Sequence, residues 1–137
     1  MQTTDSGLDV DLDEYRRRAE RKREELSCEE LTARQETVTE MLGLLGKAHT
    51  LAILGQFAFD GGPFRFNELE SELQISPNTL SERLSELVDA GLLTRESYDE
   101  IPPRVEYEAA EKTDFLAPVF GHLFAWAGEF DLEPADE

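Results

Sequence analysis

The segment SPNTLSERLSEL, residues 76–87, combines short polar side chains with an apolar repeat. At about 100° per residue its three leucines fall on one face of a helix, whereas Asn78, Glu82 and Ser85 point away from them. Asparagine can contact adenine through two hydrogen bonds, serine and threonine can contact bases or phosphates, and glutamate can accept from cytosine N4. The polar face thus has the chemistry for reading base edges, although Glu82 could equally repel phosphate and such helices are common in helical proteins.

The flanks of this helix extend the candidate surface. Thr79 and Ser81 border the polar face, while Arg83 lies nearer the apolar stripe, where its stem can pack and its guanidinium can still reach outward. Ser76 suits the N-cap and Pro77 the first helical position. The residues expected closest to DNA on this helix are Ser76, Asn78, Thr79, Ser81, Glu82 and Arg83.

The preceding sequence predicts the elements that position this helix. An apolar helix should stop at the turn residues 60–63, Asp-Gly-Gly-Pro, after which Phe-Arg-Phe forms a short bridge. Asn67 is expected to cap a short helix over 68–73, and Gln74-Ile75 makes the turn into the polar helix. Two short helices joined by a tight turn indicate a helix-turn-helix.

A β-hairpin is predicted directly after the polar helix. Gly91 ends the helix, residues 92–98 form one strand, and residues 104–109 alternate apolar and polar side chains as a half-buried strand does. A hairpin in this position is a wing, with Arg95 and Arg104 on its two arms, placed to hold phosphates or to enter a minor groove. The alternative is that each arginine pairs with a neighbouring carboxylate such as Glu96 or Glu106.

Composition restricts the remaining classes of function. The 137 residues favour one domain, and 31 acidic against 13 basic residues give a net charge of −18 that is spread along the whole chain. A scattered acid excess with few lysines is typical of proteins from salt-in halophiles; the alternative is an acidic protein that binds no nucleic acid. A single cysteine excludes an intramolecular disulfide, and two distant histidines predict no metal site. We find no catalytic constellation and no cofactor motif, and we expect a cytoplasmic protein without a membrane span.

The two ends of the chain are predicted to form a partner surface. We expect a disordered tail over 1–8, N-terminal helices for dimerisation over 9–42, a winged helix-turn-helix with a dimerisation helix over 43–130, and an acidic tail over 131–137. Ser27 and Glu30 fit a capping box that opens the second helix. The basic cluster over 16–23 can pair with acids within four residues, so a solvated face is favoured over a DNA-binding arm.

The last helix carries more apolar surface than one small domain needs to cover. Pro118 should kink or restart it. Its expected dimer-interface residues are Phe115, Leu116, Val119, Phe120, Leu123, Phe124 and Trp126.

Four motifs together, GKAHTLAIL, FRFNELESEL, ISPNTLSERLSELVDAGLLTR and IPPRVEYEA, resemble the HxlR family of winged helix-turn-helix regulators over Leu44 to Trp126. The resemblance implies a mainly α, MarR-like fold with a small β-hairpin wing that dimerises through its terminal helices and binds DNA. There are departures from the family pattern. His49 replaces a usual tryptophan and is expected to pack within a helix, Ala110 replaces a capping threonine, and Cys28 lies too far from the first core helix to favour a redox switch.

These observations predict a regulator that binds double-stranded DNA at a pseudo-palindromic operator as a homodimer. The main alternative is a winged-helix interaction module that docks on a transcription partner without binding DNA, which the acidic residues near the polar helix favour. A third possibility is a regulator whose aromatic dimer interface encloses a small-molecule effector of unknown identity.

Overall fold

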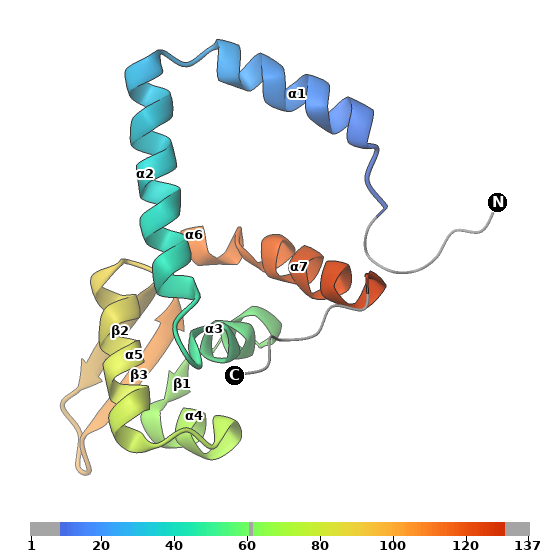
Figure 1. Ribbon diagram of the computed structural model, residues 1–137. Coiled ribbons are helices and arrows are strands. Elements are labelled where there is room, and N and C mark those ends of the chain that lie inside the picture. The colour runs from blue at the N-terminus through green and yellow to red at the C-terminus, as the bar shows by residue number, and fades with distance from the viewer. Residues whose placement is uncertain (1–8, 61, 131–137) are drawn as a thin grey trace. The chain divides into compact units, whose positions relative to one another are not determined.

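The computed structural model describes residues 9–60 and 62–130, so the expected tails, 1–8 and 131–137, and Gly61 of the expected turn lie outside it. The chain divides into two compact units, which we call the winged unit (Gly43–Pro118) and the terminal unit (Met1–Leu42 with Val119–Glu137). The described elements are mostly helical with one small antiparallel sheet (Figure 1). The predicted fold class is confirmed.

Helix α1 (Leu12–Glu24) precedes the winged unit, and α2 (Cys28–Leu45) runs into its first residues. The expected capping box begins α2, because Ser27 N donates to Glu30 Oε1 at 3.3 Å and Glu30 N donates to Ser27 Oγ at 3.1 Å. Neither helix has a buried residue. In α1, Arg16 pairs with Asp13 at 3.5 Å.

The winged unit contains the expected helix-turn-helix. It consists of α4 (Phe66–Leu73) and α5 (Pro77–Asp89), and α3 (Thr50–Phe59) precedes it. The expectation that Asn67 caps α4 is wrong: the helix begins two residues earlier than predicted, with Arg65 at the N-cap and its backbone N donating to Glu68 Oε1 at 2.8 Å. The expectation that His49 packs within a helix is also wrong, since it is exposed and precedes α3 with a left-handed φ of 73°.

Three strands form one antiparallel sheet in the order β1-β3-β2. The predicted hairpin is present as β2 (Leu93–Tyr98) and β3 (Arg104–Ala109). The expected short bridge is β1 (Phe64–Arg65), which pairs with Tyr107 and Glu106 of β3. This pairing ties the chain just before α4 to the wing.

The core of the winged unit brings together apolar side chains from α3, α4, α5 and the hairpin. Its fully buried members are Ile53, Leu54, Phe57, Leu69, Leu80, Leu84, Leu87 and Leu93. After the hairpin, α6 (Glu111–Asp114) is anchored by Thr113, whose buried Oγ1 donates to the backbone oxygen of Leu92 at 2.5 Å.

The last long helix is α7 (Ala117–Glu129). Pro118 lies in its first turn, where a missing N–H costs no helical hydrogen bond, so the expected restart is confirmed. Among the helices of the described residues, none is long and apolar enough to cross a membrane.

Candidate nucleic-acid interface

Helix α5 forms as the local sequence dictates. Ser76 is its N-cap and accepts a hydrogen bond from Thr79 N at 3.4 Å, with Pro77 in the first turn. Leu80, Leu84 and Leu87 are fully buried, as predicted. Burial of three leucines on one stripe fixes which face of the helix remains outside.

The outward face of α5 is short and polar. Asn78, Ser81, Glu82 and Ser85 are exposed, as predicted, and Thr79 is half-buried. Ser76 Oγ donates to Thr79 Oγ1 at 3.0 Å, so the two hydroxyls stand together at the helix N-terminus. Such side chains allow close approach of a partner to the helix backbone.

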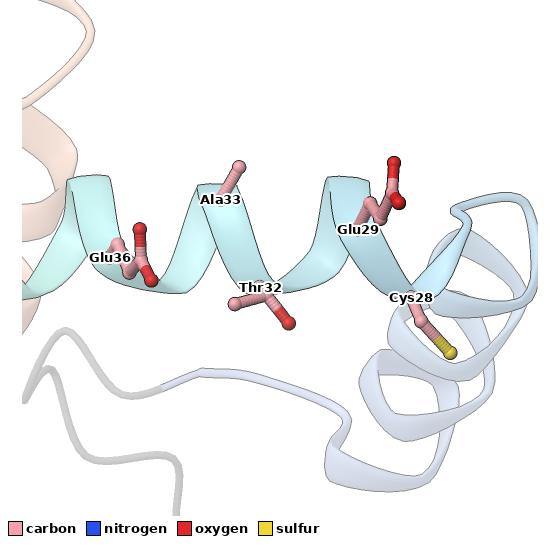
Figure 2. Close-up of a pocket in the computed structure, with 5 residues that line it drawn as sticks. All are labelled: Cys28, Glu29, Thr32, Ala33 and Glu36. Atoms are coloured by element: carbon pink, nitrogen blue, oxygen red, sulfur yellow. The ribbon is translucent and has the colours of Figure 1, made fainter.

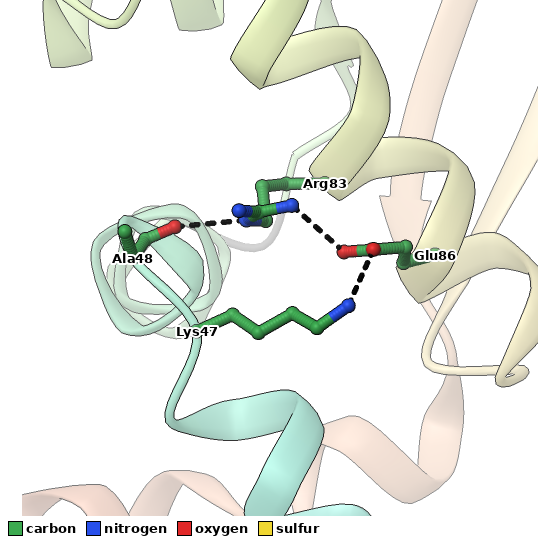
Figure 3. A network of polar contacts seen from close by, with 4 residues as sticks. All are labelled: Lys47, Ala48, Arg83 and Glu86. Atoms are coloured by element: carbon green, nitrogen blue, oxygen red, sulfur yellow. Dashed lines mark hydrogen bonds and ion pairs between the residues drawn. The ribbon is translucent and has the colours of Figure 1, made fainter.

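Arg83 does not reach outward. Its side chain is only 16% exposed, its Nε donates to the backbone oxygen of Ala48 at 3.0 Å, and its Nη1 lies 3.2 Å from Glu86 Oε1. Lys47 Nζ lies 2.6 Å from the other oxygen of Glu86 (Figure 3). The hydrogen bond from Lys47, followed by the charges of Lys47 and Arg83, lowers the pKa of Glu86 against the opposing effect of its desolvation.

The two arginines of the wing differ in what holds them. Arg95 on β2 is exposed and donates to Ser97 Oγ at 3.4 Å, and within 9–60 and 62–130 it makes no ion pair. Arg104 on β3 lies 3.3 Å from Glu100 and 3.5 Å from Glu106, and its guanidinium sits 4.1 Å from the centre of the Tyr98 ring. Arg104 therefore pairs with a neighbouring carboxylate, Glu106, which was the alternative to a phosphate contact.

A hollow of about 410 Å³ lies between α5 and the wing. Its lining residues are Ser81, Ser85, Val88, Asp89, Arg95 and Tyr107. Because Ser81 and Arg95 both line it, the polar helix and the exposed wing arginine form one continuous surface. Asp89, one of the acidic residues expected near the polar helix, also lines it, but its position beside β2 was not predicted, because nothing local in the sequence places it there.

Residues 44–134 match the family described as HxlR-like helix-turn-helix. The chain belongs to this family. Regulator BH0655 of Halalkalibacterium halodurans, named as an HTH-type transcriptional regulator, is 37% identical over 86 residues, covering 62% of this chain and 75% of that protein. This HxlR-like protein is a transcriptional regulator of the helix-turn-helix type and not an enzyme.

Solved structures support the same assignment. The reduced form of the transcriptional regulator YodB from Bacillus subtilis is 35% identical with a TM-score of 0.64, covering 73% of this chain and 96% of that chain. A regulator described as of the MarR family from Enterococcus faecalis is 30% identical with a TM-score of 0.62, covering 71% and 87% of the two chains. Helix α1 and most of α2 precede the family match.

The cysteine of this HxlR-like regulator lies outside the matched region. Cys28 is exposed in the first turn of α2, and Figure 2 shows it in line with Thr32 and Glu36 along that helix. Glu29 and Ala33 complete the lining of a shallow hollow there. Since one helix supplies every lining residue, the hollow is an open surface and not an enclosed thiol site.

The C-terminal helix of the regulator leaves large apolar side chains exposed in a single chain. Phe115 is 75% exposed and Phe124 is 84% exposed; Leu116 and Phe120 are half-buried. The others of the predicted interface, Val119, Leu123 and Trp126, are between 45% and 48% exposed. Among the described residues there is no cluster of three or more His, Cys, Asp or Glu that could hold a metal.

Proposed function

We propose that the protein is a sequence-specific DNA-binding regulator that acts in the cytoplasm as a dimer on a pseudo-palindromic operator. The observation that carries this proposal is the outward face of α5, whose exposed polar side chains adjoin the exposed Arg95 of the wing. A major groove admits an α-helix, and short polar side chains let that helix approach base edges.

Each residue of this surface has a specific role in the proposal. Asn78 contacts adenine, Glu82 accepts from cytosine N4, and Ser81 contacts a base or a phosphate. Ser76 and Thr79 lie at the N-terminus of α5, where backbone N–H groups favour a phosphate. Arg95 contacts the DNA backbone from the wing. Arg83 and Arg104 are paired within the chain, so they stabilise the positions of α5 and the wing without contacting DNA.

The dimer is supported by the exposed apolar face of α7. Six large side chains on or beside this helix are 45% or more exposed in the single chain: Phe115, Val119, Leu123, Phe124, Trp126 and Phe130. An apolar surface of this kind marks a site of protein association. A two-fold dimer places two recognition helices about 34 Å apart, one turn of DNA.

Fluorescence anisotropy tests the proposal. The protein is titrated into DNA from upstream of its own gene and into a scrambled duplex of equal length, over a series of KCl concentrations. We expect selective binding, and we expect Arg95→Ala to weaken both duplexes by a similar factor and to reduce the salt slope by about one per subunit. If neither duplex binds at any salt while the protein is folded and dimeric, α5 docks on a protein partner instead.

A further inference from the structure

The side chains of Lys47, Glu86 and Arg83, which we call the ion clamp, connect α5 to the segment between α2 and α3 (Figure 3). We propose that the ion clamp is a positioning device that sets the rotation of the recognition helix and thereby the selectivity of DNA binding. The inference rests on the proposed function and deepens it, because it assigns specificity to residues that do not touch the bases.

The geometry of the ion clamp is directional. Arg83 and Glu86 are one turn apart on the same flank of α5, about a quarter turn from its outward face. Arg83 donates to the backbone oxygen of Ala48 at 3.0 Å. The position of Arg83 is therefore set by the backbone of the segment before α3 and not by a mobile side chain. Glu86 accepts from Lys47 through one oxygen and pairs with Arg83 through the other.

Apolar packing alone would hold the rotation of α5 less sharply. The contacts of its three buried leucines are non-directional, whereas hydrogen bonds weaken steeply once their angles deviate. A rotation of roughly 20° moves an atom about 6 Å from the helix axis by ~2 Å. That displacement exceeds what a hydrogen bond from Asn78 to a base edge tolerates.

Partial burial protects the Arg83–Glu86 pair of the ion clamp from salt better than the pair with Lys47, whose side chain is 45% exposed. The side chains of Arg83 and Glu86 are only 16% and 25% exposed. Partly buried pairs are screened much less than exposed ones. Lys47 and Ala48 lie two and three residues beyond Leu45, where α2 ends, so the segment that holds α5 is continuous with that helix.

Removing Glu86 distinguishes a positioning role from a purely electrostatic one, because the two predict opposite changes in affinity for the selected duplex. Loss of one negative charge should strengthen binding to a polyanion. If Glu86 positions α5, Glu86→Ala should instead weaken binding to a duplex that the wild-type protein has selected from a random pool, by about tenfold, as one mismatched base pair does. Binding to a scrambled duplex should not weaken. Glu72→Ala, a charge removal at an exposed position of α4, should not lower the preference for the selected duplex.

A double-mutant cycle tests the ion clamp without DNA. The urea midpoints of Lys47→Ala, Glu86→Ala and the double variant should be non-additive, with the second substitution costing less than the first. In the separate DNA-binding measurement, Lys47→Arg should retain wild-type selectivity. Additive midpoints, or a Glu86→Ala protein that binds the selected duplex as tightly as wild type, would overturn the inference. If the wild-type protein selects no duplex, the proposed function fails, while the cycle still decides whether the ion clamp holds α5.

Discussion

The cations of the winged unit are mostly engaged within the chain. Lys47 and Arg83 share Glu86, and Arg104 lies between Glu100, Glu106 and the ring of Tyr98. Arg65 and Arg95 contrast with them, since both are exposed and make no ion pair among the described residues, and Arg95 donates to the hydroxyl of Ser97. At the residue scale, the proposed recognition therefore depends on short polar side chains of α5, with long cationic ones supporting them.

The pKa of Glu86 makes the ion clamp sensitive to acid. Its folded-state pKa is lowered, chiefly by the hydrogen bond from Lys47, so its stabilising effect is present above its ordinary pKa and is lost as pH falls through the folded value. Wild type should therefore be more stable than Glu86→Gln near pH 7; the difference should begin to shrink near the ordinary glutamate pKa of about 4.3 and vanish only below the lowered folded pKa. Urea unfolding at a series of pH values measures this. In a Lys47→Met background the pH-dependent difference should largely disappear; if it persists in full, Lys47 is not its source.

Contacts of this kind also limit what the sequence predicts about the site. Leu80, Leu84 and Leu87 were assigned to the buried stripe from spacing alone, and that is confirmed. The contacts of Arg83 with Ala48 and of Glu86 with Lys47 were not predicted, because these residues lie 35 and 39 positions apart in the sequence. A side chain at the edge of a helix has two directions open to it, and only tertiary packing decides between them.

At the scale of elements, local signals explain where α5 and α2 begin. Ser76 with Pro77, and Ser27 with Glu30, cap these helices as predicted. The start of α4 was predicted wrongly at Asn67, because β1 pairs with β3 and leads the chain directly into the helix at Phe66. That pairing places Arg65 opposite Glu106, and no local sequence pattern predicts a contact between residues so far apart in the chain.

The junction between α5 and β2 depends on a glycine. Gly91 has a φ of +78°, and a Cβ there would lie 2.7 Å from Lys112 Nζ. Gly91→Ala should lower the free energy of unfolding by about 1–2 kcal/mol, because a left-handed conformation is unfavourable for alanine. Chemical denaturation measures this loss.

Gly55→Ala serves as the matched control for this substitution. Gly55 lies inside α3 with open space around its Cβ direction. Alanine there should raise the free energy of unfolding by about 0.5–1 kcal/mol, since a helix interior favours it over glycine. Equal losses at both positions would contradict the role assigned to the backbone of Gly91.

At the scale of the whole molecule, α7 leads to a prediction about association. Phe124→Asp should raise the dissociation constant of the dimer by roughly tenfold or more, because it places a charge in the apolar surface while a side chain that is 84% exposed contributes little to the single chain. Sedimentation velocity over a concentration series measures the shift. Ile101→Ser at the fully exposed wing tip is the control and should leave the dimer intact. An unchanged dimer in the Phe124 variant would place the interface elsewhere.

The net charge of −18 leads to the remaining prediction, which concerns salt. Near 1 M salt the Debye length is roughly 3 Å, so the acid excess no longer repels DNA over the distance at which the partners meet. If the scattered carboxylates adapt the protein to molar KCl, selective DNA binding should persist or improve from 0.2 to about 3 M KCl, because relief of repulsion opposes the usual loss from counterion release. Within the winged unit, Lys47, Arg83 and Arg104 are paired within the chain, so fewer of its cations can release counterions on binding DNA. Anisotropy with selected and scrambled duplexes, together with circular dichroism at each salt, separates binding from folding. A folded dimer whose selective binding collapses as salt rises would show that ordinary phosphate contacts dominate and that the acidity serves another purpose.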